Sequence, residues 1–376
     1  MSRFAAVVGW GKSGQGAAGA LLARDWQVRA FDACGGQSVF FDDVAGVDVH
    51  VDDNPETLAQ AIVKASPDLV VVSPGIPAHH PVFSACEAAS IEVWGEVELA
   101  WRLQEEGPHA GRPWLVVTGT NGKTTTVGML GEILRCAGAK AEEVGNIGTP
   151  ITRAIDSDAE VFAVELSSFQ LHTARTVSPL ASICLNVDAD HLDWHGSVEA
   201  YAADKARVYE NTIRACVYPA SDRRVEQMVE NADVVEGARA IGLTLGSPSV
   251  SQFGIVEGLL VDRAFVEDRA RHATALAHIS DLAGAYGPHP SAAVVSDALA
   301  AAALARAYGV EPEAVEAGLR AFPPAGPPRP GFAPPPGPVW WVGGGHPTSG
   351  GARGGLALPG GLSPRAGCGR LPTPHT

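Results

Sequence analysis

The stretch WLVVTGTNGKTTT, residues 114–126, joins an apolar strand to a glycine-containing loop and then to an apolar helical run. A strand, a loop and a helix in this order form phosphate-binding loops, in which backbone N–H groups surround a phosphate. The first glycine of the usual pattern would fall at Val117, yet Gly and Asn still permit the tight turn. The lysine would reach the β- and γ-phosphates, and the first threonine hydroxyl after it would bind Mg²⁺. We therefore predict that a nucleoside triphosphate binds at Gly119, Thr120, Asn121, Gly122, Lys123, Thr124 and Thr125.

The pattern on both sides of this loop is that of an α/β protein. Short apolar runs alternate with helical stretches rich in Ala and Leu, which predicts parallel strands joined by helices. The polar segment 104–113 contains Gly and Pro, so we expect it to separate a Rossmann-like N-terminal domain (1–108) from a central P-loop ATPase-type α/β domain (109–322). Strands are expected at 4–8, 28–31, 69–73, 114–118, 161–165 and 182–187, and helices at 16–24, 298–308 and 312–322.

The composition changes abruptly at Pro323. From there to Thr376 about half of the residues are Pro or Gly, and the last acidic residue of the chain is Glu316. Such a segment buries too little apolar surface to offset its ordering entropy, so we predict an irregular or disordered tail over 323–376. The bias toward Gly, Pro, Ala and Arg favours an out-of-frame translation of a GC-rich gene over a natural tail. If no other reading frame of the gene yields a globular continuation, that hypothesis fails.

Charge and composition argue against several classes of function. The formal net charge of −15 is unsuited to a general nucleic-acid surface, which needs clustered Lys and Arg. No apolar run approaches the roughly 20 residues that span a bilayer, and the first residues lead into a strand rather than a secretory signal. The six cysteines are scattered without a CxxC pair, which is typical of reduced thiols. We expect a cytoplasmic protein without nucleic-acid binding or membrane insertion.

A second glycine loop, GWGKSG at residues 9–14, follows the first expected strand and fits the pattern G-x-G-x-x-G. Asp32 ends the next strand, where a dinucleotide-binding fold places an acid on the ribose. Taken alone, the pattern suits an NAD-dependent dehydrogenase. Its physical content is narrower, because a helix N-terminus with closely approaching backbone favours any diphosphate, UDP as well as NAD. A dehydrogenase would not need the triphosphate loop, so we favour UDP.

Several motifs together resemble one enzyme family. GTNGKTTT (119–126) resembles the ATP loop of Mur ligases and folylpolyglutamate synthases. Further stretches resemble the Mur ligases that add D-glutamate: VSPGI (72–76), GEVEL (95–99), EVGNIG (143–148), ELSSFQL (165–171) and NVDADHLD (186–193). The resemblance covers residues 4–322. It implies a monomeric enzyme that joins D-glutamate to UDP-N-acetylmuramoyl-L-alanine through an acyl phosphate in peptidoglycan precursor synthesis, with conversion of ATP to ADP and two Mg²⁺ sites.

The resemblance also implies roles for single residues. The catalytic residues would be Lys123, Glu165, His191 and Lys205. The metal ligands would be Thr124, Glu165, His191 and Lys205, the last as a carbamate, which turns an ammonium into a carboxylate-like ligand. Glu165 suits this role because it ends an apolar strand near the phosphate loop, whereas His195 is expected to be an ordinary loop residue. UDP would be bound by Gly11, Ser13, Gly14, Asp32, Ser73 and Gly75, and the muramoyl part by Asn146 and Ser167.

Two departures from the family pattern bear on activity. GPHPSAA at 287–293 replaces His-Asn-x-x-Asn, whose asparagines help seat the adenine, so the contacts near His289 are left open. No motif of the family's C-terminal, D-glutamate-binding domain follows Phe322. Without that domain, the amine of D-glutamate is not positioned and water is not excluded from the acyl phosphate. Three functions stay open: a ligase by descent whose present chain is inactive, a protein that binds UDP-sugar or ATP without ligation, and a dehydrogenase.

Overall fold

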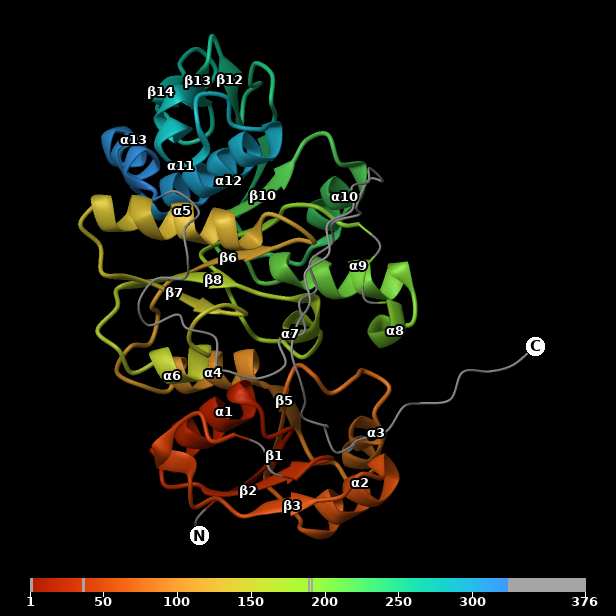
Figure 1. Ribbon diagram of the computed structural model, residues 1–376. Helices are drawn as coiled ribbons and strands as arrows, with labels where there is room; N and C mark the ends of the chain where they lie inside the picture. Colours follow the sequence, from red (N-terminus) through yellow and green to blue (C-terminus); the bar gives the residue numbers. More distant parts are fainter. Residues whose placement is uncertain (1–2, 36–37, 189, 191, 324–376) are drawn as a thin grey trace, which may run out of the picture. The chain divides into compact units, whose positions relative to one another are not determined.

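The computed structural model describes residues 3–35, 38–188, 190 and 192–323, all of which belong to one compact unit. Their strands form two sheets (Figure 1). The first sheet is parallel, with the order β3-β2-β1-β4-β5 that is typical of a Rossmann-like fold. Its strands are β1 (Phe4–Val8), β2 (Gln27–Asp32), β3 (Val49–Val51), β4 (Leu69–Val72) and β5 (Val93–Gly95). The strand order reverses between β1 and β4, which is where ligands bind in such sheets.

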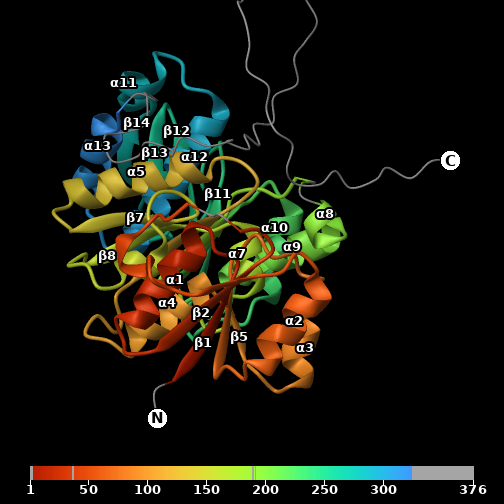
Figure 2. The ribbon, with the colours of Figure 1, turned by 60° about the horizontal axis from the view of Figure 1, so that its bottom comes forward.

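Side chains of β1 alternate between two helical layers, as the pleat of a strand requires. Ala5 and Val7 are buried with residues of α1 (Lys12–Leu22) and α4 (Glu96–Glu105). Ala6 and Val8 are buried with residues of α2 (Pro55–Lys64) and α3 (Pro81–Ala88). Figure 2 shows these two pairs of helices on opposite sides of the first sheet.

The second sheet has nine strands in the order β14-β13-β12-β11-β10-β9-β6-β8-β7. The strands from β7 to β12 pair in parallel, whereas β13 and β14 extend the sheet as antiparallel strands. Their bounds are β6 (Trp114–Thr118), β7 (Ala141–Gly145), β8 (Val161–Glu165), β9 (Ala181–Cys184), β10 (Ala215–Pro219), β11 (Arg239–Leu243), β12 (Gln252–Val256), β13 (Leu259–Asp262) and β14 (Thr274–His278).

Three long helices cover one face of the second sheet. Leu115 and Val117 of β6 are buried with residues of α5 (Lys123–Cys136), α12 (Ala292–Tyr308) and α13 (Pro312–Ala321). Trp114 and Val116, on the other face, belong to a buried apolar cluster that continues to β1. The remaining helices are α6 (Ile151–Ala154), α7 (Ser168–His172), α8 (Leu192–His195), α9 (Val198–Ala206), α10 (Arg223–Asn231) and α11 (Ala283–Tyr286), with 3₁₀ turns at Asp42–Val44, Arg207–Tyr209 and Ile279–Leu282. Within the described ranges, no helix combines the length and apolar character that a bilayer span requires.

The α/β class and the parallel sheets are confirmed, and β1, β6 and β8 have the predicted bounds. The predicted start of the first helix at residue 16 is wrong, because α1 begins at Lys12. Glycines disfavour a helix, but Gly14 and Gly16 are buried here, and a Cβ at Gly16 would lie 3.1 Å from Cβ of Pro150. The predicted start of the long C-terminal helix at residue 298 is also wrong, because α12 begins at Ala292 and Ser291 caps it. The division at 104–113 falls between the last helix beside the first sheet and β6, and the domain bounds remain predictions. The predicted tail begins at residue 323, and its residues 324–376 lie outside the described part of the chain.

Candidate functional site

The phosphate loop lies between β6 and α5, at the carboxyl end of a central strand. Gly119 (φ +153°) and Gly122 (φ +86°) have backbone angles that side chains disfavour, which explains glycine at both positions. Oδ1 of Asn186 accepts hydrogen bonds from the backbone N–H groups of Thr120 and Asn121, both at 2.9 Å. Asn186 follows β9, so the adjacent parallel strand fixes the conformation of the loop.

The loop is connected to β8 by a chain of side-chain hydrogen bonds. Thr124 donates from Oγ1 to Oε2 of Glu165 at 2.9 Å, and Asn146 donates from Nδ2 to Oε1 of Glu165 at 2.9 Å. Glu165 is 1% exposed, so its carboxylate depends on these donors. Lys123 folds back onto the loop and donates from Nζ to the carbonyl oxygens of Gly119 (2.9 Å) and Thr120 (3.0 Å). The structure thus brings together three predicted metal or phosphate residues.

Lys205 reaches the same loop from α9. It is 2% exposed, and Nζ donates to the carbonyl oxygen of Gly119 at 2.8 Å. The ammonium lies 4.7 Å from the centre of the Tyr201 ring. Burial lowers the pKa of Lys205 to about 8, so an appreciable fraction of the amine is uncharged near neutral pH. An uncharged amine is the form that reacts with CO₂, and the environment is therefore suited to a carbamate.

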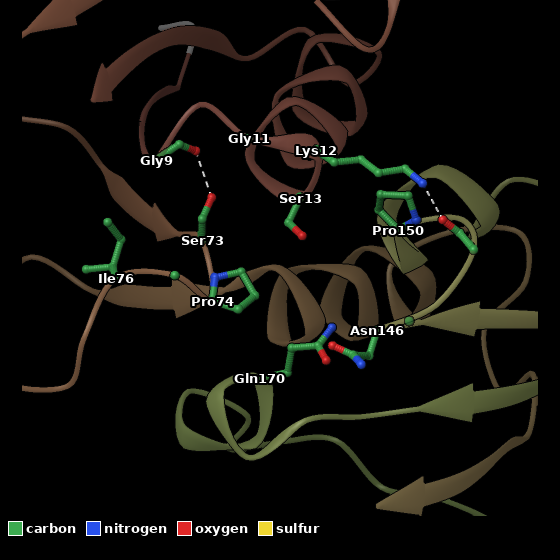
Figure 3. A pocket seen from close by; sticks show the side chains of 13 residues that line it. Gly9, Gly11, Lys12, Ser13, Ser73, Pro74, Ile76, Asn146, Pro150 and Gln170 are labelled. Atoms are coloured by element: carbon green, nitrogen blue, oxygen red, sulfur yellow. Dashed lines mark hydrogen bonds between the residues drawn. The ribbon is translucent and has the colours of Figure 1, made fainter. Parts of the chain in front are cut away.

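A pocket of about 560 Å³ lies at the first glycine loop (Figure 3). Five of the predicted substrate-binding residues line it: Gly11, Ser13, Ser73, Gly75 and Asn146. One wall consists of the loop before α1, the first residues of α1 and the segment after β4, and the other consists of residues from 145–150 and α7. The pocket therefore lies at the reversal of strand order in the first sheet and is completed by the segment that follows β7.

Gly14, Asp32 and Ser167 are not among the residues that line this pocket. Asp32 accepts hydrogen bonds from the backbone N–H groups of Trp10 (2.5 Å) and Cys34 (2.8 Å), so its carboxylate holds the loop. A side chain at Gly14 would collide with the carbonyl oxygen of Gly9. Ser167 caps α7 through reciprocal hydrogen bonds with Gln170. Direct ligand contacts of these three residues remain predictions.

Two polar residues that line the pocket were missed by the sequence analysis, Lys12 and Gln170. Lys12 donates from Nζ to the carbonyl oxygen of Gly148, and burial lowers the pKa of Lys12. It is the variable position inside G-x-G-x-x-G, so the motif itself drew attention only to the glycines. Gln170 belongs to ELSSFQL, and its position three residues after Ser167 is the signal of a capping box.

The predictions for the two histidines of HLDWH have different outcomes. His191 lies outside the described residues, and its roles as catalytic residue and metal ligand stay predictions. The expectation that His195 is an ordinary loop residue is wrong. His195 ends α8, its side chain is fully buried, and Nδ1 lies 3.0 Å from Oδ2 of Asp204. Asp204 lies on α9 and Ser168 on α7, so these contacts depend on how separate helices pack and no local pattern revealed them.

Asp297 of α12 is a further polar group beside the phosphate loop. A Cβ added to Gly122 would lie 2.5 Å from its Oδ1. The residue is 9% exposed, and burial raises the pKa of Asp297 to about 7. It precedes the apolar run that the sequence analysis assigned to a helix. Among the described residues, no three His, Cys, Asp or Glu side chains form a group that could hold a metal. The predicted metal ligands instead combine a hydroxyl, a carboxylate and a lysine.

Comparisons with known proteins agree with this arrangement. The Mur ligase middle domain family matches residues 117–245, which include the phosphate loop, Glu165 and Lys205. The UDP-N-acetylmuramoylalanine–D-glutamate ligase of Streptomyces coelicolor is 54% identical over 259 residues, which cover 68% of this chain and 54% of that protein. The ligase of the same name from Tropheryma whipplei is 38% identical over 339 residues, which cover 85% of this chain and 66% of that protein. The chain thus spans about half to two thirds of the length of these relatives.

A solved structure supports the fold. The crystal structure of UDP-N-acetylmuramate:L-alanyl-gamma-D-glutamyl-meso-diaminopimelate ligase from Neisseria meningitides has a TM-score of 0.52 and 18% sequence identity. The match covers 86% of this chain and 98% of that chain. At this identity the likeness concerns the fold alone.

Proposed function

Because this chain belongs to the Mur ligase family, we propose that it serves the ATP-dependent, ADP-forming ligation of D-glutamate to UDP-N-acetylmuramoyl-L-alanine. The observation that carries the proposal is the chain of contacts from the phosphate loop to the pocket. Thr124 contacts Glu165, Glu165 contacts Asn146, and Asn146 lines the pocket at the first glycine loop. A nucleotide on the loop and a substrate in the pocket would therefore meet at one carboxylate.

The residues present fit Mg²⁺-ATP. The glycines at 119 and 122 have the positive φ angles that a phosphate-cradling turn needs, and α5 begins directly after them. The hydroxyl of Thr124 and the carboxylate of Glu165 offer oxygen ligands, which Mg²⁺ prefers. We propose that Thr124 and Glu165, with Lys205 as a carbamate and His191, hold two Mg²⁺ ions. When bound, Mg²⁺-ATP supplies the phosphoryl group and neutralises charge on the phosphates.

The protein's own residues would position the reacting groups. Lys123 would exchange the carbonyl oxygens of Gly119 and Thr120 for phosphate oxygens, which bind an ammonium more strongly. In the pocket, Lys12 would add positive charge beside a diphosphate, and Asn146 would orient the muramoyl part of the substrate. Two anions must approach each other when the substrate carboxylate is activated. Cationic groups fixed in advance lower the energy of that approach.

The proposal includes a cytoplasmic monomer acting in peptidoglycan precursor synthesis. D-Glutamate is its third substrate, and no residue predicted from the sequence is assigned to it. A protein that binds UDP-sugar or nucleotide without ligation is the alternative.

Titration calorimetry and a phosphate-release assay test the proposal with the full chain. We expect UDP-N-acetylmuramoyl-L-alanine and a Mg²⁺-bound, non-hydrolysable ATP analogue each to bind, and phosphate release to require D-glutamate. Binding of both ligands without phosphate release would establish the binding-only alternative. Binding of neither ligand would refute the proposal, and a fluorescence change with NADH would revive the dehydrogenase hypothesis.

A further inference from the structure

A largely buried polar cluster outside the phosphate loop joins Ser168, His195 and Asp204 with the half-buried His172. Nδ1 of His172 lies 2.9 Å from Oδ1 and 3.0 Å from Oδ2 of Asp204, and Nδ1 of His195 lies 3.0 Å from Oδ2. Nε2 of His195 lies 3.0 Å from Oγ of Ser168. The side chain of Asp204 is 10% exposed and that of His195 is fully buried. A carboxylate buried to this degree needs donors, and two imidazoles supply them.

The carboxylate of Asp204 fixes the direction of the hydrogen bonds from Nδ1 of the two histidines. A carboxylate accepts and cannot donate, so both histidines carry a proton on Nδ1. Nε2 of His195 faces the hydroxyl of Ser168, which can either donate to it or accept from it. Arg207 adds a positive group, with Nε 3.6 Å from Oδ1 of Asp204. A serine, a histidine and an aspartate in this order also occur in hydrolases, but Ser168 is only 2% exposed and cannot reach a substrate.

The cluster joins three helices that carry or directly follow residues of the proposed site. His172 ends α7, whose Gln170 lines the pocket at the first glycine loop. His195 ends α8, which follows His191 directly in the sequence. Asp204 lies in α9, immediately before Lys205. α7 has five residues and α8 has four, so neither can hold its orientation by its own backbone hydrogen bonds.

Aromatic rings enclose the two histidines. The ring of His195 is stacked on Phe169, with centroids 5.4 Å apart and an interplanar angle of 15°. Trp194 lies 4.5 Å from His195 and 5.3 Å from His172 between ring centroids. Tyr201, which also contacts Lys205, lies 5.1 Å from His195. Around the fully buried His195, apolar surroundings of this kind strengthen the hydrogen bond to Asp204 because they exclude water, whereas the side chain of His172 is 28% exposed.

We propose that Asp204 is a positioning residue, whose carboxylate holds α7 and α8 in fixed orientation against α9 by accepting from His172 and His195. Gln170, which lines the pocket, and Lys205, which contacts the phosphate loop, thereby keep their positions relative to each other. The choice of ligands in this inference rests on the proposed function, whereas the contacts of Asp204 are independent of that function. The substitution Asp204→Asn preserves size, but it removes the negative charge and replaces one of the two acceptor oxygens with an NH₂ donor.

The test compares Asp204→Asn with Glu199→Gln, which removes the same charge from an exposed position of α9. We expect Asp204→Asn to weaken binding of UDP-N-acetylmuramoyl-L-alanine about tenfold, as loss of one charge-assisted hydrogen bond would. Affinity for ATP without metal should change less than affinity for the UDP-sugar, because the phosphate loop contacts α9 through Tyr201 and Lys205 and not through Asp204. Glu199→Gln should resemble the wild type in both. The proposal would be overturned if the wild type and both variants bound the UDP-sugar equally well. It would also be overturned if Asp204→Asn lost affinity for the UDP-sugar and for ATP to the same extent.

Amide hydrogen exchange without ligands separates this inference from the proposed function. Asp204→Asn should increase exchange in α7 and α8 and leave the protection of α5 unchanged. If exchange changes in this way while the wild type binds no UDP-sugar, the role of Asp204 in holding the helices stands and the proposed function fails. If Asp204→Asn does not fold, His172→Gln removes one contact only and should show the same pattern in α7 alone. Unchanged exchange in both variants would overturn the inference.

Discussion

Glu98 of α4 provides a quantitative test of how the two sheets are held together. Its side chain is fully buried and accepts four hydrogen bonds. The donors are the backbone N–H of Arg175 (2.7 Å), the backbone N–H and hydroxyl of Thr176 (2.9 and 2.6 Å) and Nε of Arg102 (2.7 Å). The carboxylate thus binds α4 to the segment that follows α7. We predict that Glu98→Gln lowers the free energy of unfolding.

The magnitude follows from the number of donors that lose an acceptor. Glutamine keeps one acceptor oxygen, so its NH₂ group must face either two backbone N–H groups or Arg102 and the Thr176 hydroxyl. A hydrogen bond to a charged group contributes about 1.5–3 kcal/mol. The Thr176 hydroxyl can turn and accept, whereas the other donors cannot. We therefore expect a loss of about 2–4 kcal/mol, between one and two such hydrogen bonds.

The same contact predicts a dependence on pH. Burial alone would raise the pKa of Glu98, but the hydrogen bonds from Thr176, Arg175 and Arg102 outweigh it and lower the pKa below its ordinary value. A carboxyl whose pKa is lower in the folded state stabilises the fold above its unfolded pKa, roughly 4.3. That stabilisation is lost as the pH falls through the folded pKa. The difference between wild type and Glu98→Gln should therefore shrink in acid.

Urea unfolding followed by circular dichroism measures both effects. Unfolding at pH 7 and at about pH 3.5 gives the two free-energy differences, and Glu92→Gln, at an exposed position near the same helix, is the control. The control should lie within about 0.5 kcal/mol of the wild type. A loss below about 1 kcal/mol for Glu98→Gln at pH 7, or an equal loss at both pH values, would refute the reasoning.

Three further predictions concern the phosphate loop. Burial lowers the pKa of Lys205 to about 8 from 10.5, so between these values the unfolded chain binds more protons than the folded one and stability rises with pH. Urea unfolding at pH 7.5 and 9.5 should show that rise in the wild type and not in Lys205→Met. Gly122 and Gly111 both have a positive φ, which strains any side chain. A Cβ at Gly122 would also lie 2.5 Å from Oδ1 of Asp297, whereas a Cβ at Gly111 would meet no atom within 4 Å. Gly111→Ala should cost about 1–2 kcal/mol in thermal unfolding and Gly122→Ala clearly more, and equal losses would contradict a role for Asp297. Glu165→Gln should weaken Mg²⁺-dependent nucleotide binding at least about tenfold and leave metal-free binding unchanged, which calorimetry with and without Mg²⁺ can decide.

Local sequence was sufficient wherever the physical cause is local. Short apolar runs predicted β1, β6 and β8 with their bounds, because burial on both faces of a parallel strand requires such runs. The phosphate loop was predictable because its turn needs glycine and its chemistry needs Lys123 and Thr124 in adjacent positions. Glu165 was predictable because β8 is parallel to β6, and parallel strands end at the same edge of the sheet.

Tertiary structure decided the features that depend on residues distant in sequence. Lys12 and Gln170 come from different parts of the chain and line one pocket only because the segments 145–150 and 168–172 complete it. His195 looked like a loop residue, yet Asp204, Ser168 and Phe169 surround it. Asp32 fits a ribose-binding pattern, but its carboxylate accepts from the backbone of Trp10 and Cys34. A motif states which groups are available, whereas the packing of separate segments determines which of them remain free to meet a ligand.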